Sequence, residues 1–128
     1  MSTTGITSFQ KSSKSFRNLI LWNKFKNLLL ITYKLTDMLP ASENFGLRSQ
    51  MQRAIVSVLS NFVEGYLKKS SKEKLHFLEI SETSLLELEA QAEICLILDY
   101  WNEEDYLKFD RSRAEAGYFL HQYISKIY

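Results

Sequence analysis

Turn-forming residues are scarce in this chain, which has one proline and four glycines among 128 residues. Sandwiches and barrels need a turn roughly every ten residues, and their turns rely heavily on these two residue types. The shortage argues against an all-β fold and favours long helices. The length is typical of one domain, and a 45% share of hydrophobic residues is enough to build a core.

Apolar residues from Phe16 onward recur mainly at three- and four-residue steps, as on one face of a helix. Pro40 and Gly46 interrupt this pattern, and two segments, Ser70–Glu73 and Asn102–Asp105, are typical of helix N-terminal caps. We therefore expect helices over residues 15–38, 47–67, 70–101 and 102–127. Short connections make successive helices antiparallel. The predicted fold is all-α: an antiparallel up-down-up-down four-helix bundle over residues 16–128, preceded by a flexible N-terminal arm over residues 1–15.

No segment is typical of a signal peptide or a membrane span. The most apolar stretch, residues 19–31, contains two lysines and two asparagines and is shorter than the roughly 20 apolar residues that a span requires. The single cysteine cannot form an intrachain disulfide. These features predict a cytoplasmic protein with no membrane partner.

Signals for catalysis are weak. Glu73-x-x-His76 has the ligand spacing of di-iron bundles, but such a site needs the motif twice, and Tyr118 stands three residues before the other histidine, His121. Cys95 lies in an apolar run, which favours a packing role over a nucleophilic one. No glycine-rich phosphate loop is present. We expect no enzyme activity, no cofactor and no metal.

Two short runs are apolar on every side of their helices, residues 28–31 and 94–98. A helix of a lone bundle has an outer face that normally meets water. An apolar outer face needs another partner, and the simplest one is a second copy of the chain. We therefore predict a homo-oligomer.

A polar stripe follows the second helix at steps of three and four residues, and a similar one, which includes Ser81 and Gln91, follows the third. If the stripes face each other, Arg53 could pair with Glu87, and Asn61 with Ser84 or Ser81. A pocket or catalytic network would use such residues, but a structural polar layer that sets helix register is the favoured interpretation. The predicted layer comprises Gln50, Arg53, Ser57, Asn61, Glu64, Ser84 and Glu87.

A set of short motifs from about Phe16 to Tyr100 carries a family resemblance. These motifs are Trp22, Tyr33-x-x-Thr36, Leu39-Pro40, Glu43-x-x-Gly46-Leu47, Gln50, Arg53-Ala54, Ser57, Ser60-Asn61-Phe62-Val63-Glu64-Gly65, Phe77-Leu78, Ser84-Leu85 and Glu87-Leu88. With them the sequence resembles the four-helix bundle proteins encoded in intervening sequences of bacterial 23S rRNA genes. The resemblance implies a bacterial protein that forms a ring-shaped homopentamer. It also implies kinship with the accessory variability determinant of diversity-generating retroelements, which binds nucleic acid and a reverse transcriptase.

The near-neutral net charge conceals two halves of opposite sign. Through Lys74 the chain has 12 Lys/Arg and 4 Asp/Glu, a charge of +8, whereas from Leu75 onward it has 4 and 11, a charge of −7. An antiparallel bundle brings the start of the first helix beside the turn between the second and third, so the cations there should gather at one end. A basic end of this kind, repeated around an oligomer, suits a nucleic-acid phosphate backbone. The predicted nucleic-acid-binding residues are Lys11, Lys14, Arg17, Lys68, Lys69, Lys72 and Lys74.

The leading hypothesis from sequence is thus a non-enzymatic, pentameric four-helix bundle whose basic end binds RNA or DNA, as an accessory to a machine that processes nucleic acid. The alternative is a protein-interaction scaffold with no nucleic-acid role, recruiting partners through apolar faces and an acidic end. A third hypothesis is an enzyme that uses Arg53, Glu64 and Glu87, or Glu73 and His76, as an acid/base or metal site.

Overall fold

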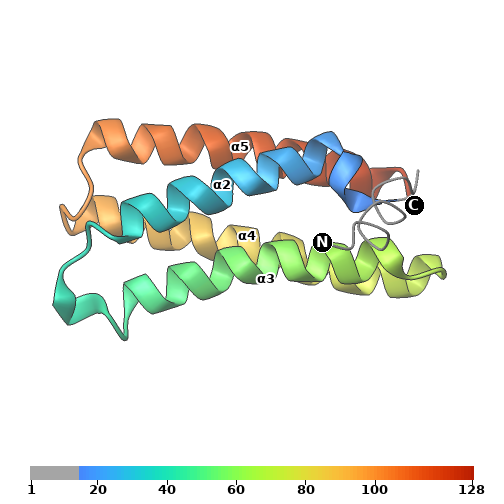
Figure 1. Ribbon diagram of the computed structural model, residues 1–128, viewed down its shortest axis with the longest axis horizontal. Coiled ribbons are helices and arrows are strands. Elements are labelled where there is room, and N and C mark those ends of the chain that lie inside the picture. The colour runs from blue at the N-terminus through green and yellow to red at the C-terminus, as the bar shows by residue number, and fades with distance from the viewer. Residues whose placement is uncertain (1–14) are drawn as a thin grey trace, which may run out of the picture.

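The computed structural model describes residues 15–128 and contains four long helices that run alternately up and down (Figure 1). They are α2 (Ile20–Thr36), α3 (Leu47–Leu67), α4 (Ser71–Ile97) and α5 (Glu103–Ser125). Two single-turn 3-10 helices, η1 (Phe16–Asn18) and η2 (Ala41–Glu43), precede α2 and α3. The expected four-helix bundle is confirmed. The predicted arm falls on residues 1–14, outside the described residues, whereas Ser15 is buried.

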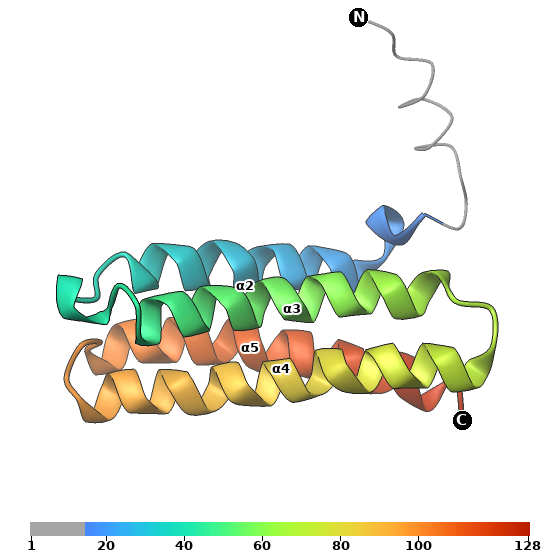
Figure 2. The same ribbon diagram turned by 90° about the horizontal axis from the view of Figure 1, so that it is seen from below.

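The helices form a square in cross-section. Each helix packs on two neighbours, α2 on α3 and α5, and α4 on the same two. α2 and α4 therefore lie on one diagonal, as the two perpendicular views in Figures 1 and 2 show. The start of α2, the α3–α4 turn and the C-terminus share one end of the bundle, and the α2–α3 and α4–α5 connections share the other (Figure 2).

The first helix differs from its predicted range of residues 15–38. Ser15 accepts a hydrogen bond from the Arg17 amide and starts the short helix η1, after which Leu19 is extended and α2 begins at Ile20. The far end is shorter too, because the Arg48 side chain donates to the backbone oxygens of Thr36 and Leu39 and so occupies carbonyls released at the helix end.

The second helix spans Leu47–Leu67, as predicted, but the third ends at Ile97 rather than near Trp101. Asp99 adopts a left-handed conformation with φ of 59°, and the amides of Tyr100 and Trp101 both donate to the Cys95 carbonyl. This turn directs the Trp101 side chain into the core, where its Nε1 donates to the Leu35 carbonyl at 2.9 Å. The predicted caps at Ser70 and Asn102 are both present, accepting from the amides of Glu73 and Asp105.

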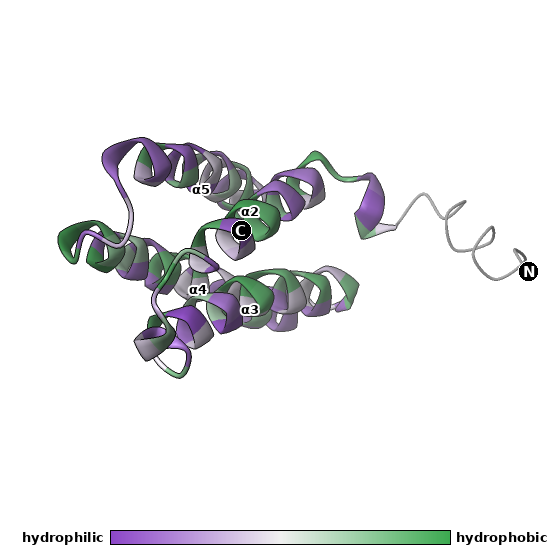
Figure 3. Ribbon diagram, turned by 60° about the vertical axis from the view of Figure 1, so that its left-hand side comes forward, coloured by the Kyte–Doolittle hydropathy of each residue, from purple (hydrophilic) through white to green (hydrophobic). Residues whose placement is uncertain are grey.

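The core runs the whole length of the bundle. Near the α2–α3 connection, Trp101 packs against Phe109, and nearer the other end Phe25 of α2 packs edge-on against Phe62 of α3. The C-terminal part of α4 remains apolar on its outside and is green in Figure 3, with Ile97 73% exposed. Within residues 15–128, no helix combines the length and apolar content needed to cross a membrane.

Candidate nucleic-acid interface and polar groove

The basic end of the bundle is the first candidate site. We define it by the cations Arg17 in η1, Lys68 and Lys69 after α3, and Lys72 and Lys74 in α4. Antiparallel packing places these three segments at the same end, as expected from the chain order (Figure 2). The other two predicted cations, Lys11 and Lys14, lie outside the described residues.

The lysines of the basic end differ in the contacts that their side chains make within the bundle. Lys74 Nζ donates to the carbonyl oxygens of Gly65 and Tyr66, at 3.4 and 2.8 Å, and thereby caps the C-terminus of α3. Lys68 Nζ lies 3.8 Å from a Glu64 carboxylate oxygen and over the Phe77 ring. Lys69 and Lys72 are exposed and form no hydrogen bond or ion pair with another residue of the 15–128 range. These two are thus the most available to a ligand.

A groove of about 380 Å³ opens between α3, the α3–α4 turn and α5 at this end. Tyr66 and Tyr123 form one part of its wall, with ring centroids 6.2 Å apart, and Lys68, Lys69 and Lys74 form another. Burial, with a smaller contribution from Tyr66, raises the pKa of the Tyr123 hydroxyl, so it is a neutral hydrogen-bonding group at physiological pH. The groove combines cations with aromatic surface.

Tyr123 and Lys126 also lie at this end and were not predicted from the sequence. Both come from the last turns of the fourth helix region, where Lys126 shares a second groove of about 380 Å³ with Leu19, Ile20 and Tyr123. The spacing of Phe119 and Tyr123 would have placed both rings on one helix face. Helix packing, and not a local sequence motif, brings α5 close to the α3–α4 turn.

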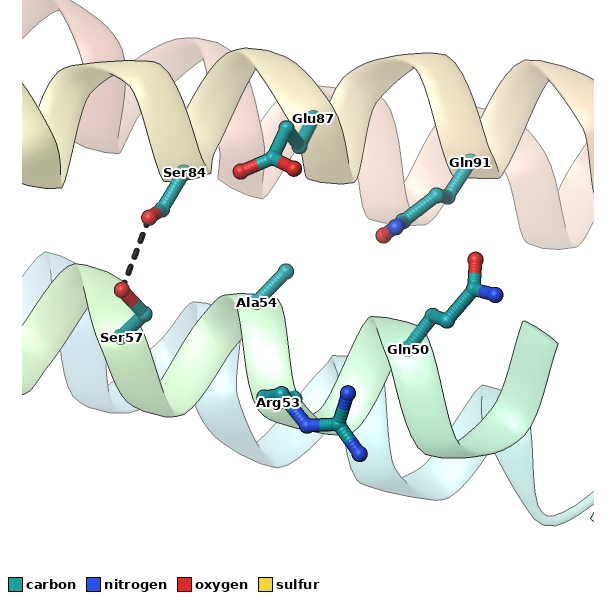
Figure 4. Close-up of a pocket in the computed structure, with 7 residues that line it drawn as sticks. All are labelled: Gln50, Arg53, Ala54, Ser57, Ser84, Glu87 and Gln91. Atoms are coloured by element: carbon teal, nitrogen blue, oxygen red, sulfur yellow. Dashed lines mark hydrogen bonds between the residues drawn. The ribbon is translucent and has the colours of Figure 1, made fainter. Parts of the chain in front are cut away.

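The polar stripes of α3 and α4 form a groove rather than a closed layer, as Figure 4 shows. Its volume is about 380 Å³, and it is lined by Gln50, Arg53, Ala54, Ser57, Ser84, Glu87 and Gln91. Ser57 and Ser84 join the helices through their hydroxyls at 2.8 Å, and Asn61 donates to Ser57 Oγ at 3.1 Å. Below them, buried Ser81 donates to the Val58 carbonyl at 2.7 Å.

The charged members of the predicted layer are exposed and do not pair across the groove. Arg53 runs along α3 and donates to Ser49 Oγ at 3.3 Å, so the expected Arg53–Glu87 pair does not form (Figure 4). Likewise, Asn61 reaches Ser84 through Ser57 and not directly. The pair does not form because Arg53 and Glu87 lie on the solvent-exposed side of the α3–α4 contact, where water hydrates both charges. Serines occupy the inner side of this contact. Glu64 is also exposed and lies near Lys68.

The Glu73-x-x-His76 motif has a local structural role. Glu73 accepts from Ser70 Oγ at 3.3 Å in the cap of α4, and His76 packs against Phe77 at the surface. Within residues 15–128, no group of three or more His, Cys, Asp or Glu side chains is arranged to hold a metal ion.

This helical bundle matches a known protein family. The family model of the 23S rRNA-intervening sequence protein matches residues 17–122. The chain belongs to this family. A crystal structure from Bacteroides thetaiotaomicron, described as a protein of unknown function from the S23 ribosomal protein family, superposes with a TM-score of 0.75. The two sequences are 20% identical, and the match covers 82% of this chain and 98% of the other, which shows a shared fold.

None of the curated proteins compared with the chain matches it. The resemblance noted from sequence is thus confirmed for the 23S rRNA intervening-sequence family. Several of the residues that carried it line the α3–α4 polar groove, namely Gln50, Arg53, Ala54, Ser57, Ser84 and Glu87.

Proposed function

We propose that this protein is a non-enzymatic, cytoplasmic, homopentameric bundle that binds the phosphate backbone of RNA or DNA through its basic end. The observation that supports the proposal is the clustering of Lys68, Lys69 and Lys74 around one groove of the basic end, with Lys126 lining a second groove there. The name of the family, which refers to 23S rRNA genes, points in the same direction.

The physical argument is electrostatic. Lysines bind phosphates with release of condensed counterions, and such binding weakens as salt rises. A cyclic oligomer repeats the basic end once per copy around one axis, so even one or two phosphate contacts per copy add to a multivalent surface. The Tyr66 and Tyr123 rings supply an apolar wall beside those contacts.

Charge reversal at the two most available lysines tests this proposal. Labelled RNA and DNA are titrated with the protein at about 50 and 200 mM salt, and we expect binding that weakens steeply between them. The K69E/K72E variant should weaken binding for all sequences and reduce the salt slope by about one for each lysine lost per copy. The matched control is K108E/R111E, which makes the same charge change at exposed positions in the first part of α5.

No binding at low salt would overturn the nucleic-acid proposal, as would equal loss of binding in both variants. The homopentamer has its own test, light scattering, with an expected mass five times the 15.0 kDa of the chain. A monomer at high concentration would contradict it.

A protein-interaction scaffold is the second candidate function. Exposed apolar side chains favour it, among them Leu30 at 67% and Ile97 at 73% exposure. Partner proteins should then be retained after nuclease treatment, whereas nuclease-sensitive retention would favour the nucleic-acid proposal.

A further inference from the structure

Two grooves at the basic end adjoin each other, because the Tyr123 side chain lines both. The Tyr66 groove lies between the end of α3, the α3–α4 turn and α5, and the Phe119 groove lies between the start of α2 and α5. Each has a volume of about 380 Å³. Small-molecule sites commonly have volumes of about 300–1,000 Å³. Each groove is therefore large enough to hold a small ligand or one unit of a polymer.

Each groove has an aromatic and apolar wall. In the Tyr66 groove, the rings of Tyr66 and Tyr123 lie beside Leu67, which is 66% exposed. In the Phe119 groove, the Phe119 ring lies near Ile20, which is also exposed. Exposed apolar side chains next to half-buried rings form a surface that a flat aromatic ligand can cover.

Several polar groups of the grooves have no partner in the bundle. The hydroxyls of Tyr66 and Tyr123 and the side-chain amide of Asn18 make no hydrogen bond with another residue of the 15–128 range. Burial raises the pKa of the Tyr123 hydroxyl, which can therefore donate as well as accept at physiological pH. Donors and acceptors of this kind suit the polar edge of a nucleobase.

Lysines border both grooves, and among the described residues no carboxylate lines either one. The side chains of Lys69, at the Tyr66 groove, and Lys126, at the Phe119 groove, form no hydrogen bond or ion pair within the described part of the chain. Lys74 uses two of its three donors on α3 carbonyls, and Lys68 lies 3.8 Å from Glu64. Lys69 and Lys126 are thus the cations best placed to meet phosphates.

An unpaired nucleotide has all the features that these grooves suit: a flat base, a polar base edge and a phosphate. In a duplex the faces of each base are covered by its neighbours and its pairing edge is occupied, so an aromatic wall cannot reach them. Lysines alone would favour the duplex, whose two strands give it the higher density of charge. The aromatic walls therefore point to a strand with accessible bases.

We propose that the two grooves bind adjacent unpaired nucleotides of an RNA or DNA strand, with one base against Tyr66 and Tyr123 and the next against Phe119. Lys69 and Lys126 contact the phosphates. This inference rests on the nucleic-acid binding proposed above and names its substrate class, a single-stranded segment. The contacts should tolerate many sequences, because every base has an aromatic face.

The test compares a short labelled single strand with the blunt duplex of the same sequence, each prepared as RNA and as DNA. At about 200 mM salt, where backbone contacts are weakened, we expect the single strand to bind at least about fivefold more tightly than the duplex. The RNA and DNA arms show which of the two strands the grooves prefer.

Two variants locate the effect in the grooves. L67S removes exposed apolar surface, and Y123L removes the ring that both grooves share, so each should weaken single-strand binding about threefold or more and leave duplex binding unchanged. The matched control is L30S, the same substitution at a leucine of equal exposure, 67%, in the middle of α2. It should leave both affinities unchanged. Circular dichroism checks folding, and L67S decides the outcome if Y123L is not helical.

Duplex binding as tight as single-strand binding would overturn this inference and leave the nucleic-acid proposal intact. Equal single-strand affinity of the wild type and L67S would do the same, as would equal losses in L67S and L30S. Absence of binding to every single strand and duplex would instead contradict the nucleic-acid proposal itself.

Discussion

Glu43 connects two loops and a helix at the end of the bundle opposite the lysines. Its Oε1 accepts from the Leu47 amide at 3.0 Å, at the start of α3, and its Oε2 accepts from the Tyr100 hydroxyl at 2.9 Å, in the α4–α5 connection. The Leu47 amide, and then Tyr100, lower the pKa of the Glu43 carboxyl from its ordinary value of 4.5. One side chain thus joins both connections at this end.

We expect E43Q to lower the melting temperature at pH 7 and to flatten the acid side of the stability profile. A carboxyl whose pKa is lowered by folding stabilises the protein above its unfolded-state pKa, and that contribution disappears as the pH falls through the folded-state pKa. The difference between wild type and variant should therefore be full above about pH 5 and shrink below the ordinary value of 4.5. Thermal unfolding from pH 3 to 7 measures it. E103Q, at an exposed carboxylate of the same end, is the control, and an equal effect there would contradict the role of Glu43.

Close approach of α3 and α4 is the main feature at the scale of elements. Small residues line their contact, with Ala54, Ser57, Ser81 and Ser84 along the middle and Gly65 near the basic end. A Cβ at Gly65 would lie 3.0 Å from the Lys74 carbonyl oxygen and 3.0 Å from Leu78 Cγ. A Cβ at that position would be tighter than ordinary contacts allow, so the α4 backbone and Leu78 would have to shift by a few tenths of an ångström.

We expect G65A to destabilise the protein by about 1–3 kcal/mol, because the added methyl group forces the two helices apart. The matched control is G117A in α5, where the new Cβ would meet Leu85 Cδ2 at an ordinary 3.5 Å. There the better helix propensity of alanine should stabilise by about 0.5–1 kcal/mol. Urea unfolding measures the change in the free energy of unfolding for each variant. Changes of the same sign in both variants would show that packing against α4 does not decide the effect at Gly65.

Helix ranges were predictable where local signals marked both ends. α3 was predicted in full because Gly46 precedes it and its apolar period ends at Leu67. The predicted C-terminal ends of α2 and α4 were wrong because contacts from other segments form there: the Arg48 side chain donates to the carbonyl of Thr36, the last residue of α2, and the burial of Trp101 against Leu35 accompanies the turn at Asp99. The inner serines of the polar stripes do join the helices, whereas the charged residues do not.

The whole molecule behaves as one unit because its core is continuous from end to end. Cys95 lies fully buried in this core, with its Sγ 3.6 Å from Met51 Sδ. Burial raises the pKa of the Cys95 thiol to about 12. In the folded state the Cys95 thiol is therefore protonated and inaccessible to thiol reagents.

Labelling of Cys95 should report global unfolding. Because the thiolate is the reactive form, we expect a thiol reagent at pH 8 to react with the native protein at least a hundredfold more slowly than with the denatured protein. The rate should rise with denaturant in parallel with the loss of helical circular dichroism. Fast labelling without unfolding would indicate that α4 opens locally near its C-terminal end.

The sequence by itself determined the class of fold, the number and direction of the helices and the separation of charge between the two ends. These properties follow from apolar period, caps and chain order, all of which are local or additive. Only the tertiary structure decided which side chains meet: Tyr123 and Lys126 joining the basic end, Arg53 and Glu87 remaining apart, and α2 and α4 facing opposite ways. Those outcomes depend on how helices rotate about their axes and how closely they pack, which no single segment specifies.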